Sequence, residues 1–178
     1  MSEKKLVMDS DDFRRCICRM SYEILEKNRG SGEIALLGIQ KKGVFMANRL
    51  AEQINRIENT TIKQGSINIA MYRDDYGTRT AKTIGPSNIP FSVDGKIIII
   101  VDDVLFTGRS FRAAIEAIFD MGRPAAIQLA VMVDRGHREL PIQADFIGRR
   151  IPTSKTEQVE VVWTEEEGPD SVYIIKDR

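Results

Sequence analysis

Three stretches of the chain are predominantly apolar without alternation: Ile34 to Ile39, Ile97 to Val101 and Ile127 to Val133. A strand that is buried on both faces has this pattern, as in the middle of a parallel sheet. Polar residues follow each stretch, and a helical pattern follows the first two. Strand, helix and strand at this spacing form a βαβ unit. We therefore expect an α/β fold with a largely parallel sheet flanked by helices.

Apolar residues at helical spacing predict three helices. The first follows a cap at Asp9 or Ser10, with acidic residues in its first turn. The second carries the apolar positions between Val44 and Ile54. The third carries those between Phe111 and Ile118, and Gly122 is its expected stop.

The remaining segments predict a strand, a lid and a closing hairpin. Ser66 to Tyr72 alternates, which suits a strand with one buried face. The polar stretch from Arg73 to Asn88 is either disordered or a flexible lid, and we favour the lid because it leads into a ligand-binding strand. Val172 to Ile175 and the alternating residues 159–163 predict an antiparallel hairpin with no assigned chemistry.

Size and charge bound the class of protein. The 178 residues suit a single domain over 1–178, and 26 basic against 26 acidic residues give no general attraction to a polyanion. No apolar run approaches the roughly 18 residues of a membrane span, and the charged N-terminus is unlike a signal peptide. Cys16 and Cys18 should point to different sides of a helix, and His137 alone cannot complete a zinc site with them. We expect a cytoplasmic protein without a membrane partner.

The run VDDVLFTGRS, directly after the strand at 97–101, holds the most informative chemistry. The hydroxyls of Thr107 and Ser110, the close approach allowed by Gly108 and the start of a helix suit a phosphate. The carboxylates of Asp102 and Asp103 would repel that phosphate and suit adjacent sugar hydroxyls. Together these halves describe a ribose 5-phosphate site. The simpler alternative, an acidic turn with a helix cap, needs one of these residues rather than six.

A second anion site is predicted where Gly38 to Gly43 joins a strand to a helix. Lys41 and Lys42 are either solvated or face an anion, and the neighbouring phosphate loop favours an anion. Arg73 and Arg79 could reach the same anion from the lid. The dinucleotide pattern GxGxxG and the P-loop pattern GxxxxGK[ST] do not occur.

VDDVLFTGRS resembles the phosphoribosyl-pyrophosphate loop of the type I phosphoribosyltransferases. The whole chain is similar to their subfamily of bacterial pyrimidine operon attenuation proteins, through YRDD at Tyr72 to Asp75, GRPAAIQLAVMVDRGHRELPI and IPTS. The resemblance implies a type I phosphoribosyltransferase-like fold with a flexible lid loop. It also implies a small base-covering hood, and the segment Asp134 to Ser154 starts at the carboxyl end of a strand, over the same cleft.

The same resemblance implies roles for individual residues. Asp102 and Asp103 are the catalytic pair that holds the ribose 2- and 3-hydroxyls. The residues implied for the 5-phosphate of phosphoribosyl pyrophosphate (PRPP) or UMP are Val104, Leu105, Phe106, Thr107, Gly108, Arg109 and Ser110. Those implied for the diphosphate are Gln40, Lys41, Lys42, Gly43 and Arg73. Those implied for uracil are Val133, Asp134 and Arg135.

Members of this subfamily bind RNA and are also uracil phosphoribosyltransferases. The implied partners are PRPP, uracil, UMP or UTP, and pyrimidine operon leader mRNA rather than DNA, with a homodimer or higher homo-oligomer as the assembly. Mg²⁺ is the implied cofactor, carried mainly by the substrate rather than by a protein metal site. The RNA contacts implied are Arg19, Lys27, His137, Arg138 and Arg149.

Three functions remain open on the sequence. The first is an RNA-binding regulator of transcription attenuation that responds to uridine nucleotides and retains transferase activity. The second is a phosphoribosyltransferase with a purely metabolic role, acting on uracil or another base. The third is a nucleotide-sensing domain without catalysis. For His137 and Arg138, a solvated loop or a subunit contact is the alternative to a role in RNA binding, and no side chain stands out as a general base.

Overall fold

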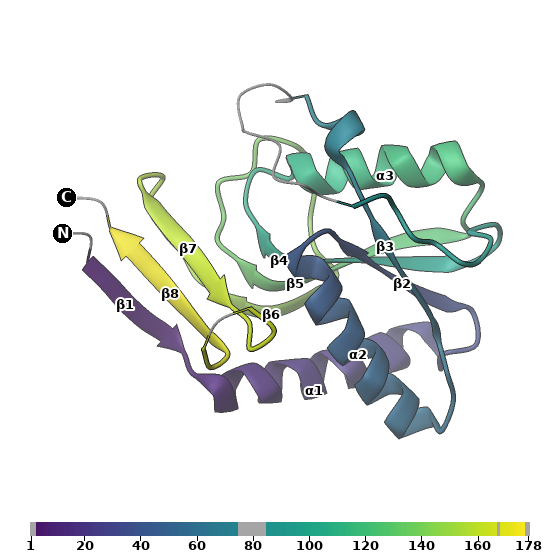
Figure 1. Cartoon of the computed structure of the whole chain (residues 1–178), viewed down its shortest axis with the longest axis horizontal. Coiled ribbons are helices and arrows are strands. Elements are labelled where there is room, and N and C mark those ends of the chain that lie inside the picture. Colours follow the sequence, from purple (N-terminus) through teal and green to yellow (C-terminus); the bar gives the residue numbers. More distant parts are fainter. Residues whose placement is uncertain (1–2, 75–84, 167, 177–178) are drawn as a thin grey trace.

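The central element is a five-stranded parallel sheet (Figure 1). The structure is a computed structural model that describes residues 3–74, 85–166 and 168–176. The strands lie in the order β3-β2-β4-β5-β6, and their bounds are Lys63–Ile67, Ile34–Ile39, Ile97–Leu105, Ala126–Asp134 and Phe146–Arg150. β2, β4 and β5 are the predicted apolar strands. Their central positions confirm the parallel α/β fold.

Helices cover both faces of this sheet (Figure 1). α1 (Ser10–Asn28) and α2 (Lys42–Glu58) lie on one face, and α3 (Arg109–Met121) lies on the other. Each face has its own apolar core: one around Phe13, Leu36 and Leu50, and the other around Ile98 and Phe111. The helices form where the apolar spacing predicts them, because their buried stripes must pack against the sheet.

A second sheet holds both ends of the described chain. β1 (Glu3–Met8), β8 (Ser171–Lys176) and β7 (Glu157–Val162) are antiparallel, in the order β1-β8-β7. The predicted hairpin is thereby confirmed as β7 and β8. Its connection leads through Trp163, whose indole is fully buried and packs edge-on against Phe13 of α1, with ring centroids 4.7 Å apart. The small sheet is thus packed onto the α1–α2 face of the large one.

Arg49 of α2 fixes the turn between β7 and β8. Its guanidinium donates to both carboxylate oxygens of Glu165 and of Asp170 at distances between 2.6 and 3.0 Å. Burial lowers the pKa of Arg49, but these hydrogen bonds outweigh burial and the pKa is raised above its ordinary value. Such bidentate, charge-assisted bonds hold the turn against α2.

The predicted strand from Ser66 to Tyr72 is wrong in its position. β3 ends at Ile67, and Ala70–Tyr72 form a short 3-10 helix in which Met71 is 90% exposed. Buried and more exposed residues do alternate around Ile67 and Ile69, but the chain leaves the sheet after Ile67.

Two edge strands were not predicted from the sequence. β1 has charged residues at its start and lies largely exposed, so its sequence does not mark it as a strand. It is a strand because it pairs with β8. β6 lies inside the segment Asp134 to Ser154, for which no strand was predicted, and completes the large sheet by pairing with β5. The strand FIGRR has too few apolar residues to be distinguished from a loop by its pattern.

The predicted lid and Arg79 fall largely or wholly on residues 75–84, which lie outside the described residues. The lid therefore stays a prediction. Within the described part of the chain, no helix has the length and apolarity that a bilayer crossing requires.

Candidate active site

The paired acids lie within β4 rather than after it. β4 continues through Asp102 and Asp103 to Leu105, and α3 begins at Arg109 after a short turn. Each carboxylate accepts a hydrogen bond from the next backbone N–H: Asp103 N to Asp102 Oδ1 and Val104 N to Asp103 Oδ1, both at 2.9 Å. The two acids therefore sit at the carboxyl end of a central parallel strand, where α/β sheets bind ligands.

The environment of both carboxyls disfavours their charged form. Burial raises the pKa of Asp102, and the neighbouring Asp103 carboxylate adds to the rise while Arg73 opposes it. Burial also raises the pKa of Asp103, against the lowering effect of the Lys42 ammonium. Hydrogen-bond donors or a cation supplied by a ligand would favour the charged forms of both acids.

The predicted diphosphate loop packs directly against this strand. A Cβ placed on Gly43 would lie 2.3 Å from the carbonyl oxygen of Val101, and one on Gly38 would lie 2.6 Å from the carbonyl oxygen of Gly43. Glycine is therefore required at both positions for β2, the loop and β4 to meet. The peptide bond between Gln40 and Lys41 is cis.

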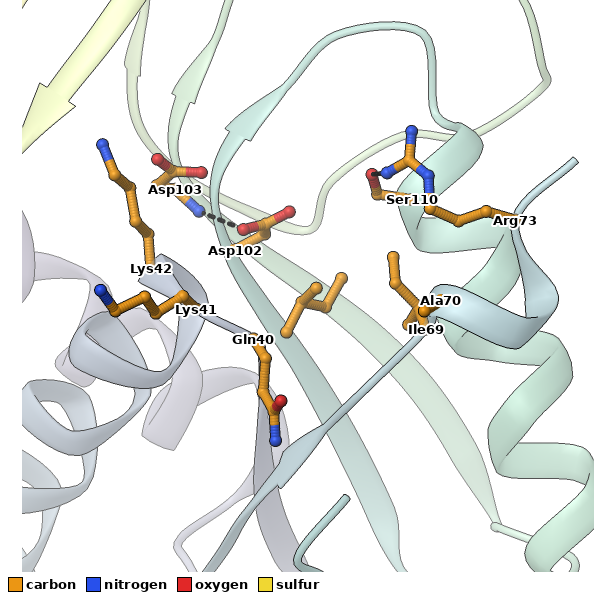
Figure 2. A pocket seen from close by; sticks show the side chains of 10 residues that line it. Gln40, Lys41, Lys42, Ile69, Ala70, Arg73, Asp102, Asp103 and Ser110 are labelled. Atoms are coloured by element: carbon orange, nitrogen blue, oxygen red, sulfur yellow. Dashed lines mark hydrogen bonds between the residues drawn. The ribbon is translucent and has the colours of Figure 1, made fainter. Parts of the chain in front are cut away.

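The side chains of this loop do not all point into the cleft (Figure 2). The Gln40 amide is turned away from the acids and donates to Ser66 Oγ at 3.2 Å and to the carbonyl of Pro86 at 2.9 Å. Lys42 Nζ donates to the carbonyl of Val161 in β7 at 2.6 Å. A contact between Gln40 and the diphosphate would therefore have to come from its backbone.

Two cavities meet at the acids. The first has a volume of about 240 Å³ and joins the diphosphate loop to the acid pair; its lining includes Gln40 to Lys42, Arg73, Asp102, Asp103 and Ser110 (Figure 2). The second has a volume of about 440 Å³ and runs along residues 103–111 to Arg135 and Val159. Arg73, Asp103 and Ser110 line both, and Arg73 Nη1 donates to Ser110 Oγ at 3.0 Å. The predicted acid, hydroxyl and lysine segments thus converge on one cleft.

The phosphate loop separates into ligand-facing and structural residues. Gly108 has a φ of 94°, which favours glycine, and it starts the turn into α3. Leu105 is 1% exposed and its side chain belongs to the core, so its predicted contact with phosphate would have to come from its backbone. The Arg109 guanidinium pairs with Asp74 and, at 3.0 Å, with Glu139. The Arg109 guanidinium is therefore paired, and the Arg109 backbone N–H donates to Thr107 Oγ1 at 3.3 Å.

The three residues predicted for uracil have different environments. Val133 is fully buried in β5, so its side chain cannot border a base. Asp134 accepts a hydrogen bond from Arg138 Nη2 at 2.6 Å. Arg135 lines the larger cavity, and its guanidinium lies 4.0 Å from the centroid of the Phe106 ring. Of the three, Arg135 alone is placed beside the cleft.

Sequence reasoning missed the contribution of β7. Val159 lines the larger cavity from the small sheet, so the hairpin that carried no predicted chemistry forms a wall of the cleft. Ile69 and Ala70 line the smaller cavity. Their positions depend on long-range packing, and no local pattern marks them.

The basic residues predicted for RNA fall into two groups. Arg19 and Lys27 on α1 border a surface hollow of about 540 Å³ beside β6, where Arg19 pairs with Glu23 and Lys27 with Asp145. Arg149 of β6 contacts Asp12 and the Val7 carbonyl.

His137 and Arg138 belong to the other group, on the cleft side of the molecule. His137 Nε2 lies 2.5 Å from the carbonyl oxygen of Thr153, and Arg138 donates to the carbonyls of Phe106 and Ile142. All five basic residues therefore have partners within the chain. A contact with RNA would have to replace these hydrogen bonds and ion pairs.

The fold and the cleft define a class of protein, and comparisons with known proteins agree with it. The chain matches the phosphoribosyl transferase domain over residues 9–165, and it belongs to that family. The hypoxanthine phosphoribosyltransferase of Trypanosoma cruzi has a similar structure, with a TM-score of 0.73, 18% identity and 97% coverage of each chain. A hypoxanthine-guanine phosphoribosyltransferase from Bacillus anthracis has a TM-score of 0.66 at 19% identity, covering 83% of this chain and 84% of the other. At such identities these likenesses show the fold alone.

Within the family, the curated relatives carry the name Bifunctional protein PyrR. The relative from Enterococcus faecalis (strain ATCC 47077 / OG1RF) is 47% identical over 173 residues, which is 97% of each chain. The relative from Pelotomaculum thermopropionicum is 48% identical over 175 residues, covering 98% of this chain and 97% of the other. The predicted resemblance to this subfamily is confirmed.

Proposed function

We propose that the protein transfers the phosphoribosyl group of PRPP to uracil, which yields UMP and diphosphate. The observation that carries this proposal is the convergence of the acid pair, the hydroxyl loop and the lysine loop on one cleft. Each group faces a different part of the same substrate: ribose diol, 5-phosphate and diphosphate. The likeness to the PyrR proteins supports uracil as the base.

The chain's own residues act by positioning the substrate and stabilising charge. Asp102 and Asp103 accept hydrogen bonds from the ribose hydroxyls, while Thr107, Ser110 and the start of α3 hold the 5-phosphate. The bond between C1 and the diphosphate oxygen breaks with its electron pair leaving on the diphosphate. N1 of uracil then forms the new bond to C1 and gives up its proton; no side chain is assigned as the acceptor. Arg135 and the exposed ring of Phe106 border the base.

The acid pair fits a divalent cation that the substrate brings with it. Two partly buried carboxylates with raised pKa favour added positive charge, and Mg²⁺ prefers such oxygen ligands. The described residues contain no group of three or more His, Cys, Asp or Glu side chains that could hold a metal ion. Mg²⁺ would supply charge neutralisation of the diphosphate, with Asp102 or Asp103 as the protein contacts.

A second function is supported by the name of the relatives, which describes them as bifunctional. We propose that the protein also binds pyrimidine operon leader RNA, more tightly with UMP or UTP present, and thereby regulates transcription attenuation in the cytoplasm. The basic residues Arg19, Lys27, His137, Arg138 and Arg149 are the proposed contacts. A homodimer or higher homo-oligomer is the proposed assembly.

The transferase is tested by incubating the protein with uracil, PRPP and Mg²⁺ and measuring UMP. The double variant Asp102→Asn with Asp103→Asn should lower the rate at least about tenfold, because charge-assisted contacts to the ribose weaken. An unchanged rate would remove the ribose assignment. The absence of UMP with the wild-type protein would leave the nucleotide-sensing alternative.

RNA binding is tested by titrating a labelled leader RNA with and without UMP at two salt concentrations. Binding should tighten with UMP and weaken with salt, because phosphate contacts release counterions. An unrelated hairpin of equal length is the control. Equal affinity for both RNAs would leave a metabolic phosphoribosyltransferase as the function.

A further inference from the structure

The side chains of the two lysines of the predicted diphosphate loop extend toward the small sheet, and that of Lys42 passes beside Asp103 on the way. Figure 2 shows both ammonium groups directed away from Asp102, toward the side where the small sheet lies. There they meet one carboxylate: Lys41 Nζ lies 3.5 Å from Glu166 Oε1, and Lys42 Nζ lies 3.7 Å from Glu166 Oε2. Each oxygen of Glu166 therefore faces one lysine.

The position of Glu166 follows from an anchored turn. Its backbone N–H donates to the carbonyl of Trp163 at 2.9 Å, and the preceding residue, Glu165, is bound bidentately by Arg49. Arg49 belongs to α2, the helix that begins at Lys42. The same helix thus carries one of the lysines and fixes the turn that presents the carboxylate to them.

The contact lies at the border between the active-site cleft and a separate hollow. Lys41 and Lys42 line the smaller active-site cavity and also a hollow of about 600 Å³, whose other walls include Glu160 and Glu166. The lysines can therefore turn to either side. At 3.5 and 3.7 Å, the pairs with Glu166 are attractive without being close hydrogen bonds, so they can be exchanged for a stronger anion.

We propose that Glu166 is an internal competitor of the diphosphate: it holds Lys41 and Lys42 in the ligand-free protein and releases them when the diphosphate end of the substrate binds. Glu166 is a positioning residue, because it acts through the lysines and touches no reacting atom. This inference rests on the proposed function, which places the diphosphate at Gln40 to Gly43. The diphosphate carries more negative charge than one carboxylate, so it takes the lysines at the cost of two weak pairs and of the hydrogen bond from Lys42 to the Val161 carbonyl.

The test is the variant Glu166→Gln, which keeps the shape of the side chain and removes its charge. Exposed ion pairs of this length contribute about 0.3–0.7 kcal/mol each, so two pairs correspond to about three- to tenfold tighter binding of inorganic diphosphate in the variant. Binding is measured by calorimetry with Mg²⁺ present. The KM for PRPP should fall by a similar factor while kcat stays unchanged. Both differences should shrink at high salt.

Two controls separate direct pairing from general charge. Glu160→Gln removes one negative charge from the same hollow, where Glu160 pairs with Lys4 instead, and it should change diphosphate binding less than twofold. In a protein with Lys41→Gln and Lys42→Gln, the further change Glu166→Gln should have no effect. An equal gain from Glu160→Gln, or a gain that persists without the lysines, would overturn the inference.

The outcomes also separate this inference from the proposed function. Diphosphate binding that is equal in the wild type and Glu166→Gln would overturn the role of Glu166 and leave the transferase in place. Binding by neither protein would overturn the diphosphate site and the inference with it.

Discussion

The strongest structural constraint on the active site is the contact between Gly43 and β4, and Gly43→Ala tests it. The added Cβ would lie 2.3 Å from the Val101 carbonyl oxygen and 3.1 Å from the Asp102 Cα. Both neighbours are backbone atoms of a central strand, so neither can rotate away. The start of α2 and β4 must instead separate by about 1 Å to reach an ordinary contact.

This separation sets the expected magnitudes. Overpacking of this kind costs about 1–3 kcal/mol of the free energy of unfolding. It also moves Lys41 and Lys42 away from the acid pair, and a displacement of about 1 Å at a catalytic site can lower the rate about 100-fold. Without the clash, alanine in place of glycine in a helix would be stabilising by up to about 1 kcal/mol. A loss of stability in Gly43→Ala therefore indicates the close contact with β4, and a gain indicates that the contact is absent.

The stability is measured by urea unfolding, followed by the fluorescence of the single tryptophan, Trp163, which is fully buried. The activity is measured as UMP formation. Gly32→Ala is the matched control, since a Cβ there meets no atom within 4 Å, and it should change neither quantity appreciably. If Gly43→Ala were as stable and as active as the control, the close approach of the loop to β4 would be refuted.

Three further predictions follow from the electrostatics and the turns. The variant with Asn at positions 102 and 103 removes two carboxyls whose pKa is raised by burial, so it should be more stable than the wild type at neutral and alkaline pH. Because a raised carboxyl pKa costs stability only once the pH exceeds the unfolded value, urea unfolding should show this gain vanish below about pH 4; a gain independent of pH would contradict it. Arg49→Ala should lower the free energy of unfolding by about 2–4 kcal/mol, since Glu165 and Asp170 lose their shared partner, and a loss below 0.5 kcal/mol would show that the turn is held otherwise. Gly108→Ala should cost about 1–2 kcal/mol because its φ of 94° is unfavourable for alanine, with a higher KM for PRPP in the UMP assay; an unchanged KM would exclude a role of this turn in phosphate binding.

The local pattern of the sequence determined the central strands, the helices that flank them and the chemistry at the end of β4. Continuous apolar runs such as Ile34 to Ile39 can be satisfied only by burial on both faces, so the parallel sheet was predictable. The acids, the hydroxyls and the glycine of VDDVLFTGRS lie within ten residues, and their spacing alone indicates a ribose phosphate. Information of this kind is local, because it depends on the period of a strand or helix and on the residues of one turn.

The tertiary structure decided everything that depends on residues far apart in the chain. β1 and β6 are strands because β8 and β5 offer free edges to pair with, and their own sequences are too polar to indicate it. The Arg109 guanidinium is occupied by Asp74 and Glu139, and the lysines of the diphosphate loop meet Glu166, more than 120 residues later. No local rule contains these partners, because a side chain's charge or shape specifies many possible contacts, and only the packing of the two sheets selects one of them.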